Sequence, residues 1–284
     1  MFKKIFFAAA LLLASELGAK PVVIASIAPV EYLAKAVGGD KIEVQSLAKG
    51  DVHSYEPKPN DMKAVAKARI FIAAGLEFEE SWIPRFKASA KNLVVVKSDA
   101  KIAKLKEEYA GQAEHDEKHE AHADPHVWLN PMLAITMARN ISDALIDMDK
   151  ANKDFYLENF QKLMNDLLAF DESAKNELAG LKNRKFVVYH PAWGYFAAHY
   201  DLEQISIERS GKEPKIDEMA STLKMIKDEN IKVIFADPNR SQKSAQILAS
   251  QTGAKVELLD PLGYNLLENL KIAVGAIKDA NSPK

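Results

Sequence analysis

The chain of 284 residues contains no cysteine. That absence excludes disulfides, a thiolate-bound metal, a thiol nucleophile and a lipid-bearing cysteine after an export signal. An excess of one charge sign is lacking too, because acids and bases are mixed along the chain and the formal net charge is only −2. The sequence therefore offers no broad basic surface for nucleic acid or an anionic membrane, and the expected partner is a small ligand or another protein.

Long hydrophobic runs are also missing. The run closest to a membrane span, Ile5 to Ala14, is shorter than the roughly 20 residues that a spanning helix needs. Lys3 and Lys4 precede it and small residues follow it, which is typical of a secretory signal. We interpret residues 1–19 as a signal peptide that is removed from a free periplasmic protein. The alternative is an uncleaved N-terminal anchor.

Hydrophobic residues make up 48% of the chain, which is enough for two globular units with their own cores. Short apolar runs alternate with helical patterns in both halves, as in parallel sheets with helices on both faces. The strands expected in the first half are Val22–Ala25, Ile42–Leu47, Ile70–Ala73 and Leu93–Val96, and those in the second half are Phe186–Tyr189, Leu202–Ile207, Val233–Ala236 and Val256–Leu259. The sequence predicts an α/β fold with two lobes, each a four-stranded, mainly parallel sheet flanked by helices.

A long helix is expected between the lobes. The stretch from Asn152 to Leu181 contains no proline and repeats apolar residues at three- and four-residue steps. We therefore assign residues 20–148 to an N-terminal α/β lobe, 149–182 to a long, rigid connecting helix and 183–284 to a C-terminal α/β lobe. A helix packed along both lobes would restrain their opening, so that ligand capture needs only modest motion.

One segment differs sharply in composition from the rest. Residues 111–125, GQAEHDEKHEAHADP, contain no apolar residue larger than alanine, and they concentrate histidines and acids. Such a composition indicates a mobile loop. Its histidines, His115, His119 and His122, are candidates for a secondary, weak metal site, and the alternative is a solvated acidic loop with no metal role.

Three other histidines stand in turn contexts at the ends of predicted strands or segments. His53 lies in GDVHSYEP, His126 in ADPHVWLNP and His190 in YHPAWGYF. Each alone could be a capping or packing residue. Because ligands of open α/β sheets bind outside the carboxyl ends of the strands, we expect the three imidazoles to meet in a cleft between the lobes. Three imidazoles with a carboxylate as a candidate fourth donor suit zinc.

The candidate fourth donor is Asp260, which follows the last predicted strand, although Asp-Pro-Leu-Gly is also a turn and helix-start signal. Asp237 has a similar turn context and is a candidate neighbour of the site. Glu56 and Asp124 are close in sequence to the histidines and are candidates for orienting an imidazole. Three aromatic residues are expected to wall the cleft or pack the core: Trp128, Trp193 and Tyr195.

Four segments resemble the metal-site motifs of one protein family. GDVHSYEPKPND, DPHVWLNP, HPAWGYFA and LLDPLG are similar to those of the metal-binding substrate-binding proteins of ABC importers, specifically the ZnuA type that supplies zinc permeases. The resemblance covers essentially the whole chain after residue 19, including the histidine-rich insertion and the connecting helix. It implies that His53, His126 and His190 are metal ligands. Asp260 matches a carboxylate that completes the metal site in some members of the family. In other members a water molecule or a nearby acid completes it. A ligand acid directly before the first histidine, seen in some members, is absent because that position is Val52.

The resemblance implies a periplasmic protein that captures Zn²⁺ between its lobes and delivers it to an ABC-type zinc permease without catalysing a reaction. The membrane permease is then the expected partner, with no nucleic acid, and the protein is expected to be a monomer. Manganese-binding relatives carry a carboxylate at position 190, so His190 favours zinc. The alternatives are a manganese or broad divalent-metal carrier of the same family and an exported zinc hydrolase, for which no HExxH motif is present. An added adhesin role stays open.

Overall fold

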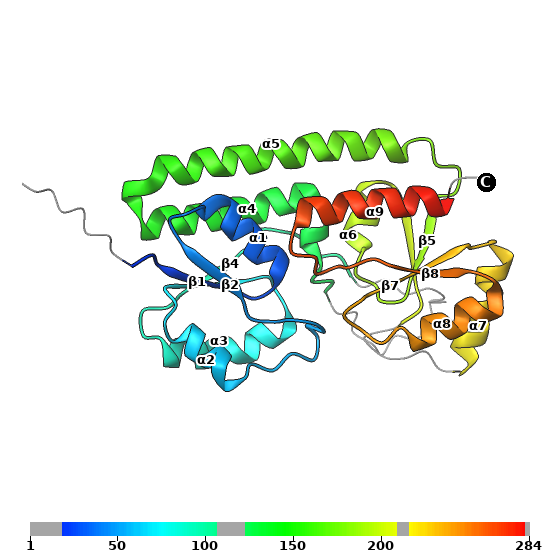
Figure 1. Ribbon diagram of the computed structural model, residues 1–284, viewed down its shortest axis with the longest axis horizontal. Coiled ribbons are helices and arrows are strands. Elements are labelled where there is room, and N and C mark those ends of the chain that lie inside the picture. Colours follow the sequence, from blue (N-terminus) through cyan, green and yellow to red (C-terminus); the bar gives the residue numbers. More distant parts are fainter. Residues whose placement is uncertain (1–18, 107–122, 209–215, 282–284) are drawn as a thin grey trace, which may run out of the picture.

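The computed structural model describes residues 19–106, 123–208 and 216–281. Within these ranges the chain forms two α/β lobes side by side, spanned by a long helix (Figure 1). The predicted fold class is confirmed. Apart from Ala19, the predicted signal peptide lies outside the described residues, and so do the loop histidines His115, His119 and His122.

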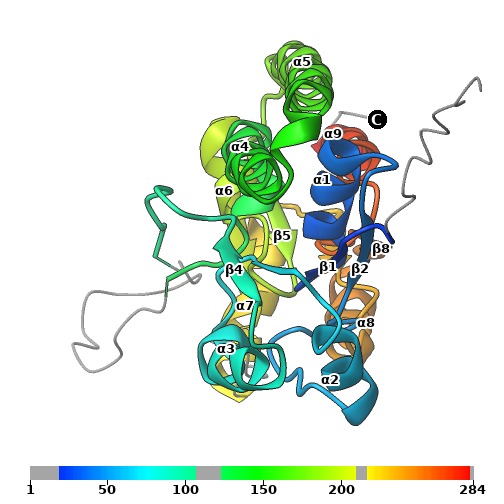
Figure 2. The same cartoon turned by 90° about the vertical axis from the view of Figure 1, so that its left-hand side faces the viewer.

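The N-terminal lobe is a sheet of four parallel strands in the order β2-β1-β3-β4. The strands are β1 (Val22–Ala25), β2 (Glu43–Ser46), β3 (Ile70–Ala73) and β4 (Val94–Lys97). Helices α1 (Ala28–Gly38) and α4 (Pro131–Met148) cover one face, while α2 (Pro59–Val65) and α3 (Glu77–Ser89) cover the other (Figure 2). Cover on both faces explains why the central strands β1 and β3 are continuously apolar and almost fully buried.

The C-terminal lobe repeats this arrangement with strands in the order β6-β5-β7-β8, again all parallel. The strands are β5 (Lys185–Val188), β6 (Glu203–Ser206), β7 (Val233–Ala236) and β8 (Lys255–Leu258), and the helices are α6 (Gly194–His199), α7 (Ile216–Asp228), α8 (Lys243–Thr252) and α9 (Leu266–Asn281). Helices α7 and α8 pack on one face, and α9 packs on the other. Each predicted strand is present, with ends that differ by a single residue or agree.

Helix α5 (Lys153–Leu178) runs across both lobes and packs against α1, α4 and α9 (Figure 1). It confirms the predicted connecting helix. The preceding helix α4 begins after Asn130, whose side-chain oxygen accepts hydrogen bonds from the backbone N–H groups of Met132 and Leu133. A short 3₁₀ turn, η2 (Lys150–Asn152), separates the two helices and reverses the chain direction.

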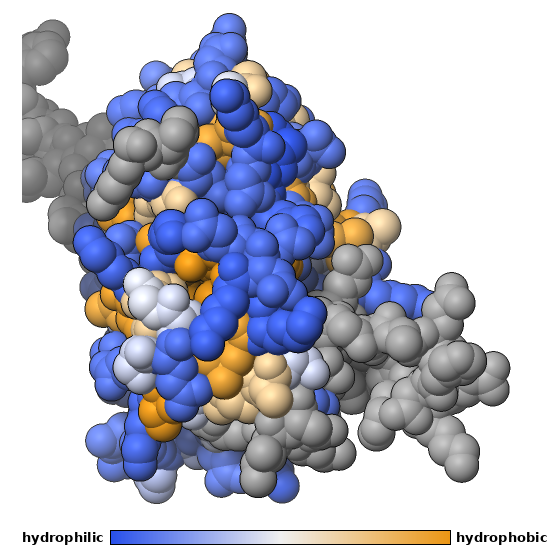
Figure 3. Space-filling model, turned by 90° about the vertical axis from the view of Figure 1, so that its right-hand side faces the viewer, coloured by the Kyte–Doolittle hydropathy of each residue, from blue (hydrophilic) through white to orange (hydrophobic). Residues whose placement is uncertain are grey.

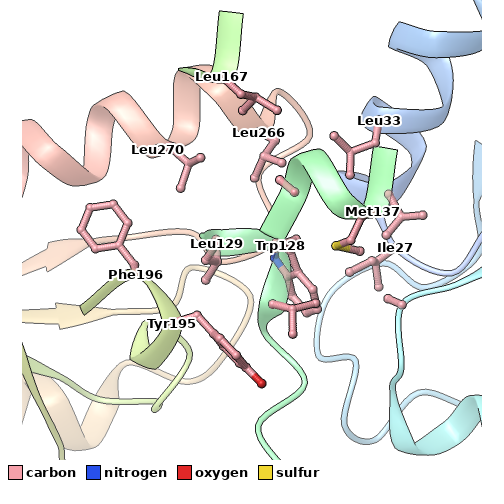
Figure 4. Packing of buried hydrophobic residues seen from close by; sticks show 14 of the residues in the cluster. Ile27, Leu33, Trp128, Leu129, Met137, Leu167, Tyr195, Phe196, Leu266 and Leu270 are labelled. Carbon is pink, nitrogen blue, oxygen red and sulfur yellow. The ribbon is translucent and has the colours of Figure 1, made fainter. Parts of the chain in front are cut away.

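One hydrophobic cluster runs through both lobes. Trp128 and Leu129 of the 3₁₀ turn η1 (Val127–Leu129) are fully buried, and they lie between Ile27 on the N-terminal side and Phe196 on the C-terminal side (Figure 4). The Trp128 indole N–H donates a hydrogen bond of 2.7 Å to the backbone carbonyl of Pro261. The three aromatic residues singled out in the sequence are all buried in this cluster: Trp128, Trp193 and Tyr195. The lobes therefore share an interior, and the cost of exposing it limits how far they separate.

The surface at the end of the C-terminal lobe is mostly hydrophilic, with hydrophobic residues scattered among polar and charged ones (Figure 3). Over the ranges that the structure describes, no helix has both the length and the apolar character needed to cross a bilayer.

Candidate metal site

The fold brings the three predicted histidines together. His53 follows β2, His190 follows β5 and His126 directly precedes η1. The Nε2 atoms of His53 and His190 are 3.1 Å apart. The ring centroids of the three imidazoles are separated by 4.9, 5.3 and 5.6 Å. One candidate ligand atom from each ring can be chosen so that all lie within 4.8 Å of one another, which is close enough for one shared cation.

Aspartates two residues upstream fix the turns that carry two of these histidines. The Asp51 carboxylate accepts a hydrogen bond of 3.1 Å from the backbone N–H of His53, and the Asp124 carboxylate accepts one of 2.8 Å from that of His126. This is the local bonding by which aspartate stabilises turns. The repeated Asp-X-His pattern thus places both rings through short-range contacts that the sequence itself contains.

Buried carboxylates also bond the outer nitrogens of two imidazoles. Asp124 lies 2.8 Å from Nδ1 of His126, and Glu208 lies 2.8 Å from Nδ1 of His190. A carboxylate in this position favours the proton on Nδ1 and leaves the Nε2 lone pair free to coordinate a metal. The predicted role of Asp124 as an orienting group agrees with this geometry, whereas Glu56 is exposed and does not line the pocket.

Three charged residues of the site were missed in the sequence: Asp51, Glu208 and Arg240. Arg240 Nη1 lies 2.9 Å from His190 Nδ1 and also pairs with Glu208, while Nη2 lies 3.3 Å from Asp51 Oδ1. Glu208 directly follows the predicted strand that ends at Ile207, just as Asp260 follows its own strand. The same strand-end criterion would have found it.

Asp260 takes part in the turn beside the histidines. Its Oδ1 accepts hydrogen bonds of 2.8 Å from the Asn239 side chain and from the backbone N–H of Leu262. It does not belong to the group of described residues whose ligand atoms cluster within 4.8 Å. Its role as fourth donor stays a prediction. Asp237 lines the same small pocket as the histidines, and burial raises the pKa of its carboxyl.

The surroundings lower the pKa values of two of the three imidazoles. Burial, together with His126 and Arg240, lowers the pKa of His53 to about 4. Burial and the same neighbours hold the pKa of His190 well below its usual range. Both rings are therefore uncharged at neutral pH, as a metal ligand must be.

The two ends of the histidine-rich insertion are tied to the site. Lys106 and Ala123 form an antiparallel bridge, and the Tyr195 hydroxyl accepts from the backbone N–H of Leu105 at 2.8 Å and donates to the carbonyl of Asp124 at 2.9 Å. These contacts connect the base of the insertion to the carboxylate that bonds His126. The secondary metal site on its histidines stays a prediction.

Zinc-uptake proteins are among the known proteins similar to this chain. The family profile described as zinc-uptake complex component A, periplasmic (ZnuA) matches residues 23–280. The high-affinity zinc uptake system protein ZnuA of Bacillus subtilis (strain 168) is 30% identical, over 93% of this chain and 88% of that protein.

Solved structures show the same fold. A crystal structure of ZnuA has a TM-score of 0.86 and 35% identity, covering 93% of this chain and all of that chain (100%). A Mn-bound periplasmic metal-binding protein from Candidatus Liberibacter asiaticus shares the fold with a TM-score of 0.78 at 21% identity, covering 93% of this chain and 100% of that one. The ZnuA proteins are transport components rather than enzymes. The chain belongs to the ZnuA family of metal-binding components of zinc-uptake complexes.

Proposed function

We propose that this protein captures Zn²⁺ with His53, His126 and His190 in the cleft between its lobes and delivers it to an ABC-type zinc permease. The observation that carries the proposal is the convergence of three imidazoles, two of them held by buried carboxylates. Family membership supports a zinc-uptake role. In the periplasm, the signal peptide at residues 1–19 would have been removed.

The choice of metal follows from the donor atoms. Imidazole nitrogens suit zinc, whereas manganese prefers a shell rich in oxygen donors. Three protein ligands leave one position of a tetrahedral zinc site for Asp260 or for a water molecule. A manganese or broad divalent-metal carrier is the alternative, since the neighbour of the same fold named above is a mutant protein with bound manganese.

Competition titrations of the metal-free protein with Zn²⁺ and Mn²⁺ test the metal. Wild type is expected to bind one Zn²⁺ in the cleft and to prefer it to Mn²⁺. The variant His190→Glu replaces a nitrogen donor by oxygen, so its preference for zinc should fall by at least about tenfold. His199→Gln is the matched control. Nε2 of His199 lies 2.6 Å from Oδ1 of Asp171, and this pair is not part of the cleft. An unchanged preference in His190→Glu would contradict the three-histidine assignment.

Delivery is a separate step and needs a separate measurement. In cells lacking the native gene, wild type is expected to restore growth under zinc limitation, and His126→Ala is expected not to. If the growth that wild type restores depended on added manganese and not on added zinc, the manganese alternative would be favoured.

A further inference from the structure

Arg240 occupies an unusual position beside the three histidines. It lies in the loop between β7 and α8, and its side chain is only 14% exposed. Its guanidinium contacts Glu208 of the C-terminal lobe and lies 3.3 Å from Asp51 of the N-terminal lobe. It is also 2.9 Å from Nδ1 of His190. One cation therefore touches both lobes and the outer edge of a candidate ligand.

This placement has an electrostatic consequence. A guanidinium stays protonated at any physiological pH, so its positive charge is permanent. A divalent cation held by His190 would lie one imidazole ring away from it, in a pocket where burial weakens solvent screening. Arg240 also neutralises Glu208, the carboxylate that would otherwise strengthen His190 as a donor. Both effects weaken the binding of a dication.

We propose that Arg240 sets the rate of metal release, a proposal that rests on the proposed zinc-binding function. The charge of Arg240 opposes the bound dication and keeps the affinity for it low enough for transfer. A carrier must bind its cargo and then give it up, and a fixed repulsive charge serves the second requirement. Arg240 is a positioning and release residue and does not coordinate the metal.

A second reading of the same contacts is a mechanical clasp, in which Arg240 only holds the lobes together through Asp51. The two readings predict opposite signs. Loss of a clasp speeds release, whereas loss of a repulsive charge slows it. Asp51→Asn breaks the ion pair between the lobes but keeps the guanidinium, and it retains a side-chain oxygen to accept from the backbone of His53. It shows the effect of losing the clasp alone, and the Arg240 variants, which lose the clasp and the charge together, decide between the two interpretations.

The experiment measures zinc affinity by competition and zinc release by stopped-flow transfer to an excess of chelator. Arg240→Gln is expected to lower the Kd and slow release by at least about tenfold, since a unit charge close to a dication is removed. Arg240→Met, a second neutral variant, is expected to do the same. Arg240→Lys keeps the charge, so its Kd should lie within about threefold of the wild-type Kd. Asp51→Asn should speed release.

Lys243→Gln makes the same charge change at an exposed position on α8 and controls for net charge. It should leave both quantities at the wild-type value. If Arg240→Gln and Arg240→Met release zinc as fast as wild type or faster, the inference is overturned while zinc binding stands. If wild type itself binds no zinc, the proposed function fails.

Discussion

Two buried carboxylates, Asp124 and Glu208, decide the direction of two imidazoles. Each lies 2.8 Å from an Nδ1 atom, so the other nitrogen of the ring is available to a metal. His126 and His190 are 2% and 6% exposed, which means that neither ring can turn to meet solvent instead. The site is thus preorganised by its outer contacts.

The lowered pKa of His53 predicts how the metal-free protein responds to acid. In the unfolded chain this imidazole titrates near pH 6.5, whereas in the fold its pKa is about 4. Between these values the unfolded state binds more protons, so stability falls as the pH falls, by up to about 1.4 kcal/mol per pH unit.

Urea unfolding of chelator-treated protein between pH 7.5 and 4 measures this slope. His53→Gln removes the titrating group and should give a shallower slope. An identical pH dependence in the two proteins would show that His53 titrates normally in the fold.

Individual residues were predictable to different degrees. Asp124 could be assigned because it bonds a histidine two positions away. Glu208 follows a predicted strand and Asp51 precedes His53 by two residues, so the criteria used for Asp260 and Asp124 could have assigned both. Arg240 meets His190 only because β7 lies next to β5, and a pattern of apolar runs does not reveal strand order, so this contact could not be predicted.

At the scale of elements, α5 holds the molecule together through a stripe of buried residues. Leu167 is fully buried in the cluster shared by the lobes, whereas its neighbour Leu168 is 40% exposed. Leu167→Ala should therefore lower the free energy of unfolding by about 2–5 kcal/mol, because it leaves a cavity. Leu168→Ala, the adjacent control, should change it by less than about 1 kcal/mol. Urea denaturation measures both, and equal effects would contradict the packing of α5 described above.

Strands and the long helix could be predicted because their apolar periodicity is local. The exact ends of the strands could not be predicted, since a strand ends where its backbone partners end. For example, β8 pairs with β7 from Lys255 to Leu258. The shared interior was also missed: the sequence suggested separate cores, but η1 places Trp128 between the lobes. Periodicity shows that a face is apolar without showing what covers it.

At the scale of the whole molecule, a shared interior predicts that both lobes unfold together. Differential scanning calorimetry of the metal-free protein should show one cooperative transition. Zinc at about one hundred times its Kd should stabilise the folded state by about 2.7 kcal/mol and raise the Tm of that single transition. Two separate transitions, of which zinc moved only one, would show that the lobes are energetically independent.

Helix α9 completes this interior from the far end of the chain. Its buried residues Leu266, Leu270 and Ala273 belong to the same cluster as Leu33 of α1. During synthesis, the part of this interior that α9 covers therefore stays open until the last elements of the chain have been made.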